Sequence, residues 1–383
     1  MKIVHILPAL TKGGAERVAV DLANEMAAQG HELTLVAGHP VDPAILASRL
    51  SPSVDLRFIN PSRPGRLAKY RDAGPWVKRE WDWLAGQDVV HAHMTYGGFV
   101  AGQIRKRRRR LKAAGPAVVE TCHSVGMPMR AHMRWLYARL SANRDAFALM
   151  AEDPFWNSFR ARHPGLHSEV ILNGVSAPRE VPADEAMVWR RATGIPDGRR
   201  IAAGTIGVLR PERRPLDFVD LFARLAQRMG PDSHFMLGGG GAMEQQVRAS
   251  VDAAGLADRI HLPGMIDEPA VALAGIDLYL TLNVGPVTGI AALEAAMAGL
   301  PVLALQTQPD YRPGEHDWIW STPDPDALAE RAAALLADDR ARRALADRQQ
   351  AYARAHHGVE AMARAYEAFY EAAIAAARRD AAR

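Results

Sequence analysis

The sequence predicts an α/β fold with two domains, each built on a parallel sheet covered by helices on both faces. Short apolar runs alternate with helical patterns along the whole chain, as in repeated βαβ units. Glycines and polar residues follow most of these runs, at the position where doubly wound sheets bind ligands. A segment rich in proline and charge, residues 176–199, divides the pattern into two series.

The composition is that of an ordinary globular protein. Of the 383 residues, 48% are hydrophobic and 23% are charged. The one cysteine, Cys122, excludes an internal disulfide and indicates a reducing compartment. No apolar stretch approaches the ~20 residues of a membrane span, and the N-terminal run is interpreted as a buried strand rather than a signal peptide. We therefore expect a cytoplasmic protein.

The first domain is predicted to span residues 1–175. Its buried strands are expected at residues 2–7, 33–37, 88–93, 117–121, 146–150 and 169–172. The helix after the first strand runs to about Ala28, and Gly30 caps it.

Five residues of this domain lie at the carboxyl ends of strands or in the turns that follow them, where a ligand site is expected. Gly13 and Gly14 follow the first strand, and His93, His123 and Glu152 follow later ones. The glycine pair can let a ligand approach the backbone, or it can simply turn the chain. A lone histidine is more often structural than catalytic, but several polar residues at one sheet edge favour a site.

Two basic stretches suggest a charged partner. One runs from Arg105 to Lys112, and the other, with aromatic bulk, from Arg130 to Arg144. Basic amphipathic helices suit an anionic membrane surface, here the inner face of the cytoplasmic membrane. The alternative is a solvated helix face whose apolar side packs on the sheet. No nucleic-acid partner is expected, because no recognition motif accompanies the charge.

Residues 176–199 lack a strand pattern and are predicted to be a linker to a second domain at residues 200–355. Strands are expected in that domain at residues 201–208, 234–237, 260–262, 276–282 and 301–305. The remainder of the chain is rich in alanine and arginine and predicts helices. Breaks are expected near residues 338–339 and 356–358, and the last helix, 356–383, should pack one aromatic face on the body.

Turns after the strands of the second domain have the composition of phosphate sites. The first carries Arg210, Arg213 and Arg214, and arginine suits paired contacts to phosphate oxygens. Another is a glycine run that includes Gly239, for which a tight turn with positive φ is the alternative. Gly264 follows a further short strand. Convergence of these turns at one edge predicts a diphosphate ligand.

The turn that contains Thr288 and Gly289 opens a helix with one carboxylate, Glu294. A glycine turn before a helix presents free amides and a positive helix end, which suits phosphate. Glu294 could accept hydrogen bonds from sugar hydroxyls. The alternative is a buried crossover helix whose acid is capped by a neighbour.

The chain resembles the retaining, nucleotide-sugar-dependent glycosyltransferases of family 4, which have the GT-B fold. The resemblance covers nearly the whole chain and rests on KIVHILPALTKGGAERVAVDLA, DVVHAHM, VVETCHS, VILNGV, GVLRPERRPLDFV, FMLGGGGAMEQQV and GIAALEAAMAGLPVLAL. It implies two Rossmann-like domains that face a cleft. The acceptor would lie on the first, the nucleotide sugar on the second, and the last helix would return to the first.

Residues and resemblance together define a predicted site. The catalytic candidates are His123, beside the reacting sugar, and Arg213, which would neutralise the diphosphate. The donor-side candidates are Gly13, Gly14, Arg210, Arg214, Gly239, Gly264, Thr288, Gly289 and Glu294. The acceptor-side candidates are His93 and Glu152.

Two positions depart from the family pattern. Pro286 replaces the first glutamate of the Glu-x7-Glu motif, and Val208 replaces an arginine that usually follows the glycine of the first turn. Arg210 or Arg214 can supply the missing positive charge, whereas nothing near Pro286 replaces the carboxylate. The fold is unaffected, but the contact to the donor sugar is in question.

The resemblance implies sugar transfer from a UDP or GDP sugar to an acceptor hydroxyl with retention, without a metal cofactor, because arginines supply the counter-charge. The expected acceptor is a glycan or lipid-linked glycan in cell-surface polysaccharide or lipopolysaccharide assembly. One alternative is a degenerate member that binds a nucleotide sugar or partner without transfer. Another is an enzyme that remodels the nucleotide sugar itself.

Overall fold

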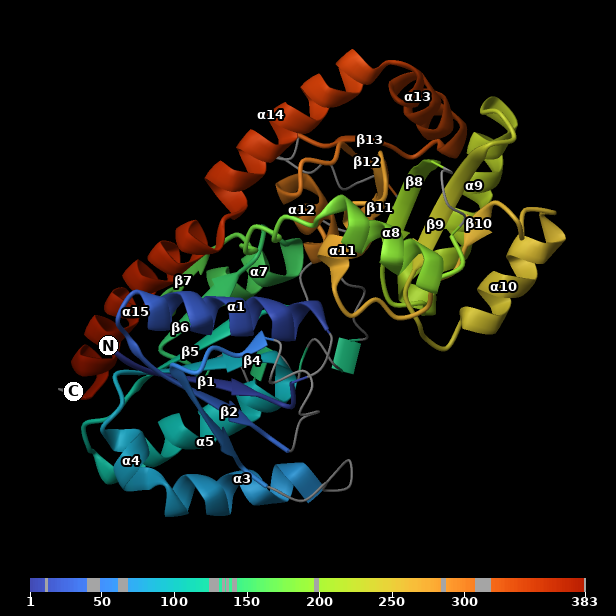
Figure 1. Ribbon diagram of the computed structural model, residues 1–383. Coiled ribbons are helices and arrows are strands. Elements are labelled where there is room, and N and C mark those ends of the chain that lie inside the picture. The colour runs from blue at the N-terminus through green and yellow to red at the C-terminus, as the bar shows by residue number, and fades with distance from the viewer. Residues whose placement is uncertain are drawn as a thin grey trace. The chain divides into compact units, whose positions relative to one another are not determined.

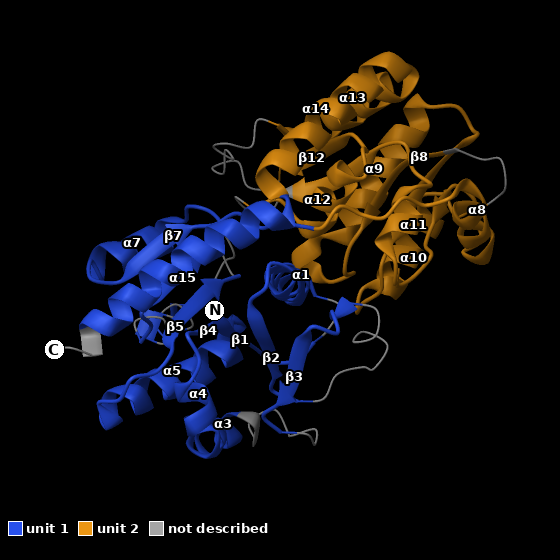
Figure 2. Cartoon of the chain, turned by 60° about the vertical axis from the view of Figure 1, so that its left-hand side comes forward, with its two compact units in different colours: residues 1–175, 358–383 blue, residues 176–357 orange. Residues whose placement is uncertain are grey.

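The computed structural model describes residues 1–10, 13–39, 49–60, 68–123, 131–132, 135, 138–139, 143–195, 200–283, 287–306 and 318–381. The chain forms two compact units (Figure 2). Unit 1 contains residues 1–175 and 358–383, and unit 2 contains residues 176–357. The search of the described helices found none with the length and apolar character of a membrane span.

Unit 1 is built on a parallel sheet in the order β3-β2-β1-β4-β5-β6-β7. The strands are β1 (Lys2–Leu7), β2 (Glu32–Ala37), β3 (Val54–Phe58), β4 (Val89–His93), β5 (Ala117–Cys122), β6 (Ala146–Leu149) and β7 (His167–Val170). Strand order reverses between β1 and β4, which makes this pair the switch point of the sheet. The sequence missed the edge strand β3, and β7 begins earlier than expected.

Helices cover both faces of this sheet, as the sequence predicts (Figure 1). They are α1 (Gly14–Ala28) and α15 (Val359–Ala381) on one face, and α3 (Ala68–Arg79), α4 (Trp81–Ala85) and α5 (Met94–Leu111) on the other. A further helix, α7 (Pro154–Arg162), packs Trp156 and Phe159 against Phe147 of β6. The predicted packing of the aromatic face of the last helix is confirmed, since Tyr366, Phe369 and Tyr370 are buried.

Unit 2 has a second parallel sheet in the order β10-β9-β8-β11-β12-β13, whose switch point lies between β8 and β11. The strands are β8 (Arg200–Ile206), β9 (Ser233–Gly238), β10 (Ile260–His261), β11 (Tyr279–Asn283), β12 (Val302–Gln306) and β13 (Trp320–Thr322). The short strand β13 was not predicted.

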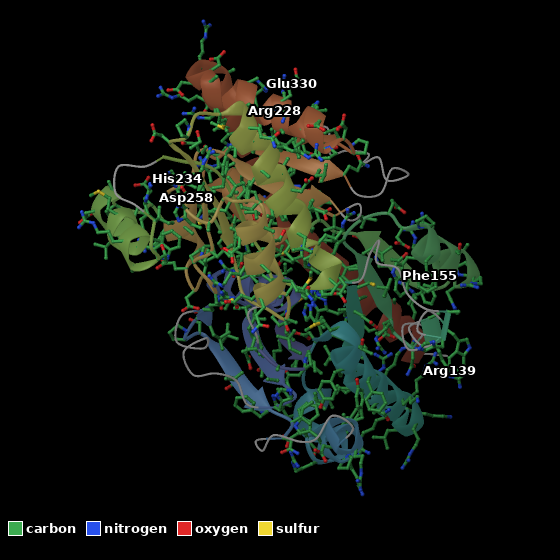
Figure 3. The ribbon with its side chains drawn as sticks, turned by 90° about the vertical axis from the view of Figure 1, so that its right-hand side faces the viewer. Arg139, Phe155, Arg228, His234, Asp258 and Glu330 are labelled. Atoms are coloured by element: carbon green, nitrogen blue, oxygen red, sulfur yellow. The ribbon has the colours of Figure 1, made fainter. Side chains whose placement is uncertain are left out.

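The helices of unit 2 pack against this sheet and against each other. They are α8 (Ala183–Ala192), α9 (Pro215–Arg228), α10 (Glu244–Ala253), α11 (Pro269–Leu273), α12 (Ile290–Met297), α13 (Pro325–Ala337) and α14 (Asp339–His357). Figure 3 labels Arg228 on α9 and Glu330 on α13, two helices that pack together. The predicted helix breaks near residues 338–339 and 356–358 are confirmed by the ends of α13 and α14.

The segment predicted to be a linker, residues 176–199, belongs to unit 2 and contains a helix that was not predicted. Helix α8 forms within it and packs on α11. Arg179 pairs with Glu185 on α8 and with Glu268 beside α11, which ties the segment into unit 2. A short helix with Ala186 as its buried residue gives too weak an apolar pattern for recognition from sequence.

Two arginines of the first basic stretch have a structural role, which the sequence did not predict. The guanidinium groups of Arg105 and Arg108 both lie 2.8 Å from the Asp145 carboxylate, and all three residues are buried. Asp145 also accepts a hydrogen bond from the Val118 amide at 2.8 Å. In the second stretch, Arg144 is buried against Glu120 at 2.9 Å, while Arg130 lies outside the described residues.

Removal of the Asp145 carboxylate should strongly destabilise unit 1. Asp145→Ala leaves two buried arginines without their counter-charge, and we expect a loss of about 3–5 kcal/mol in the free energy of unfolding. The matched control is Asp55→Ala, which breaks an exposed pair with Arg57 and should cost about 0–1 kcal/mol. Urea titration of the full-length variants measures both losses, and equal losses would contradict the account.

Acid should remove the same stabilisation. Burial opposes ionisation of Asp145, but the hydrogen bonds and charges of Arg108 and Arg105 outweigh it and lower its pKa. The contribution is therefore complete above the pKa of the unfolded chain, about 4, and is lost as pH falls through the lower folded pKa. Asp145→Ala should flatten this part of the stability–pH curve.

Candidate functional site

A group of histidines lies at the switch point of unit 1. His5 on β1 pairs in register with His91 on β4, and His93 lies further along β4 on the same face. Ring centroids are 4.9 Å apart for His5 and His91, and 4.0 Å apart for His91 and His93. All three side chains are buried.

His93 joins this group to His123, which follows β5. The Nδ1 atom of His93 lies 3.0 Å from Nε2 of His123, and its Nε2 lies 3.1 Å from Nδ1 of His5. Helix α15 supplies further links. The Tyr370 hydroxyl lies 2.6 Å from Nδ1 of His91 and 3.4 Å from Nε2 of His5.

A threonine continues the network into the core. Nε2 of His91 lies 2.7 Å from the Thr121 hydroxyl, which lies 2.7 Å from the Tyr366 hydroxyl on α15. His5, His91, Thr121, Tyr366 and Tyr370 were not predicted as members of a site. The period-two spacing of His91 and His93, and the i,i+4 spacing of the tyrosines, were the available signals.

The four rings are uncharged at neutral pH. Burial lowers the pKa of His5 to about 3 and that of His123 to about 4. Burial first, and neighbouring histidines second, lower the pKa values of His91 and His93 well below their usual value. The network therefore consists of neutral donors and acceptors.

His5, His91 and His93 also have the spacing of a metal site, with one ring nitrogen from each lying within 4.8 Å of the others. A metal site was not predicted here. Both ring nitrogens of His91 and of His93 already take part in the hydrogen bonds above, so a metal would have to displace them. We interpret the cluster as a hydrogen-bond network.

The two acceptor-side candidates lie at strand ends, as expected, but they differ in exposure and partners. His93 is 1% exposed and lies behind His123, because the chain turns into α5 at the next residue, Met94, with a φ of 60°. Glu152 is exposed and pairs with Arg160 on α7 at 2.9 Å, outside the histidine network.

Gly13 precedes α1 and caps it without a side-chain hydrogen bond. Its φ and ψ, −79° and 156°, are open to any residue, so the turn does not require glycine. An added Cβ would lie 2.3 Å from a carboxylate oxygen of Glu16, so the glycine leaves room for that side chain. Gly14 is the first residue of α1, and the amides of that first turn suit an anion.

In unit 2, Tyr279 and Glu294 lie near the turn after β8. The Tyr279 hydroxyl donates to the Ile206 carbonyl and accepts from its amide, both at 3.1 Å. Burial raises the pKa of Tyr279 to about 12, and the charges of Glu294 and Arg213 act on it in opposite directions. Glu294 is 8% exposed on α12.

The three arginines of the turn differ in their partners. Arg214 pairs with Asp217, and Arg210 lies 3.8 Å from Glu212. Desolvation first, and the charge of Arg210 second, lower the pKa of Arg213. Among the described residues Arg213 forms no ion pair within 4 Å, so its charge is the least compensated of the three. Val208 is 42% exposed in the same turn.

Within the glycine run, Gly239 has a packing role. The Gly239 amide donates to the Gly264 carbonyl at 2.7 Å, so it is not available to a ligand. Gly239 has a φ of +136°, and an added Cβ would lie 1.8 Å from the Gly207 carbonyl oxygen. Only a glycine at position 239 lets the turn after β9 lie beside the turn after β8 at Gly207.

Gly289 caps α12 in an extended conformation, with φ −64° and ψ 143° and without a side-chain hydrogen bond. An added Cβ would meet nothing within 4 Å, so neither space nor conformation requires glycine. Thr288 beside it is buried. Pro286 lies outside the described residues. The first amides of α12 have no side-chain cap, so they are a candidate anion site.

Two family models together match most of the chain. The one described as Glycosyltransferase Family 4 matches residues 12–179, and the one described as Glycosyl transferases group 1 matches residues 187–355. A 2-deoxystreptamine N-acetyl-D-glucosaminyltransferase of Streptomyces fradiae is 32% identical over 137 residues, 35% of this chain. The match spans about a third of the length of that relative, 32%.

Solved structures resemble the chain over nearly its full length. Anabaena HepE, in complex with UDP and glucose, has a TM-score of 0.75 at 17% identity and covers 97% of this chain and 99% of its own. WaaG, a glycosyltransferase of lipopolysaccharide biosynthesis, has a TM-score of 0.67 at 16% identity and covers 95% and 98%. At these identities the likeness shows a shared fold.

Proposed function

The chain belongs to the family 4, group 1 glycosyltransferases of the GT-B fold, and from this premise we propose that it transfers a sugar from a nucleoside-diphosphate sugar to an acceptor hydroxyl with retention. One observation carries the proposal. At the switch point of unit 2, Arg213 carries the least compensated charge of its turn and lies near Tyr279, whose pKa is also affected by the charge of Glu294. Glu294 belongs to α12, whose first amides are free of a side-chain cap.

This arrangement suits a nucleoside diphosphate. Arg213 and the first amides of α12 would neutralise the phosphates. Glu294 would accept hydrogen bonds from the ribose hydroxyls. During transfer the anomeric C–O bond breaks, and the diphosphate takes the electron pair. The acceptor oxygen bonds to the anomeric carbon, and its proton passes to the oxygen of the leaving diphosphate. Positive charge preorganised at the diphosphate stabilises this step without a metal.

The nature of the donor and acceptor is also a proposal. HepE was solved with UDP and glucose, and this favours a UDP sugar over a GDP sugar. The likeness to WaaG supports an acceptor in polysaccharide or lipopolysaccharide assembly. His123, the partly exposed end of the histidine network, is proposed to hydrogen-bond the sugar.

Loss of the Arg213 charge should impair transfer. The purified protein is incubated with a panel of UDP and GDP sugars and an acceptor extract, and nucleoside diphosphate release is measured. We expect Arg213→Ala to lower kcat/KM by about 100- to 1,000-fold, because it removes a charge aimed at the leaving group. EDTA should not affect the wild-type rate.

The matched control is Arg228→Ala, which removes an exposed arginine of α9 and its pair with Asp326 and should leave the rate within about twofold. Absence of release from every donor would contradict transfer and support the binding-only alternative. A sugar altered without acceptor would instead support remodelling of the nucleotide sugar.

We also propose a weak membrane contact through the exposed part of the first basic stretch. Lys106, Arg110 and Lys112 are exposed, and Leu111 beside them is 44% exposed. Such a mixture suits anionic headgroups. In the second stretch, Arg139 lies over the exposed Trp135 ring at 5.5 Å.

Neutralisation of two exposed charges should weaken binding to anionic vesicles. Each basic residue contributes about 1 kcal/mol near such a surface, so Lys106→Gln with Arg110→Gln should lower retention by about 30-fold at low salt. Arg340→Gln with Arg343→Gln, on the exposed face of α14, should not. If wild-type protein ignores vesicles that contain phosphatidylglycerol, the membrane proposal fails.

A further inference from the structure

Seven side chains of unit 1 form one continuous hydrogen-bond chain. In order, its members are Tyr366, Thr121, His91, Tyr370, His5, His93 and His123. The six links have lengths between 2.6 and 3.4 Å. The first six members are at most 2% exposed, whereas His123 is partly exposed. The chain thus has one end in the core and one end toward the surface.

This chain holds one more polar hydrogen than it has links. Each hydroxyl and each neutral imidazole supplies one polar hydrogen, so seven groups supply seven hydrogens to six links. The low pKa values of the four histidines keep the rings neutral at neutral pH. One hydrogen is therefore in excess of the six links.

The position of that hydrogen sets the direction of every link. At the inner end it would sit on the buried Tyr366 hydroxyl and point away from Thr121, which is the only hydrogen-bond partner of that hydroxyl among the described residues. In the middle of the chain it would force two donors to face each other. Buried donors without acceptors are rare and costly. At the outer end, Nδ1 of His123 has no partner among the described residues and the residue is partly exposed.

We propose that the chain holds His123 as the Nδ1–H tautomer, with His93 as its positioning residue, so that His123 offers a ligand a hydrogen-bond donor and not a base. In this arrangement Nδ1–H of His93 donates to Nε2 of His123, and Nδ1–H of His5 donates to Nε2 of His93. For the reaction, which rests on the proposed function, His123 can donate to a sugar oxygen but cannot remove the proton of the acceptor.

Nitrogen-15 NMR of the full-length protein tests the tautomer directly. Histidine rings are labelled, and the His123 signals are assigned by their loss in His123→Gln. At neutral pH we expect a protonated Nδ1 and a bare Nε2, with a preference of at least about fivefold over the other tautomer. A proton on Nε2, or a doubly protonated ring, would overturn the proposal.

A pair of variants tests the role of His93. His93→Asn keeps an amide donor close to the position of the imidazole Nδ1 and should preserve the His123 tautomer. His93→Leu removes the donor and should give a mixture of both tautomers. If His93→Leu leaves the tautomer unchanged, His93 does not position the ring. If both variants unfold, the wild-type spectrum alone decides the tautomer.

The NMR result is independent of turnover, because it is recorded without substrate. If no nucleotide sugar is consumed, the proposed function fails and the tautomer is unaffected. If Nε2 carries the proton, the present inference fails and the transfer activity is unaffected. The two failures are therefore distinguishable.

Discussion

Parallel strand pairing is the constraint from which both candidate sites follow. Every described strand pair of the two sheets is parallel, so the carboxyl ends of the strands lie along one edge of each sheet. Strand order reverses at β1 and β4, and again at β8 and β11. Loops leave in opposite directions at these points and open space for ligands. The histidine network occupies the first point, and Arg213 with Tyr279 occupies the second.

Unit 1 is incomplete without the last helix of the chain. Helix α15 buries Tyr366, Phe369 and Tyr370 on the sheet, and the bridge between Val175 and Gly358 fixes where it starts. Without α15, polar groups of the strands would lack partners on an otherwise apolar face. The helix supplies two hydroxyls to them, so the interactions that stabilise unit 1 also orient the histidines.

The sequence could predict the fold because apolar runs and glycine caps are local signals. It also placed Arg213 and His123 after strands, and Glu294 on the helix that follows the turn with Thr288 and Gly289. The histidine–tyrosine network joins residues as far apart as His5 and Tyr370, and no local pattern reports such contacts. For the same reason the structural role of Arg105 and Arg108 was not predicted. The partner of Arg105 and Arg108 is Asp145, which comes from a distant part of the chain.

The most direct test of the account is hydrogen exchange of the full-length protein with and without UDP. The account predicts slower exchange of the backbone amides at residues 207–214 and 287–294 when UDP is bound, since these turns would hold the phosphates. The Gly239 amide should change less, because it already donates to the Gly264 carbonyl. Unchanged exchange in both turns at saturating UDP would contradict the placement of the nucleotide at the β8–β11 switch point.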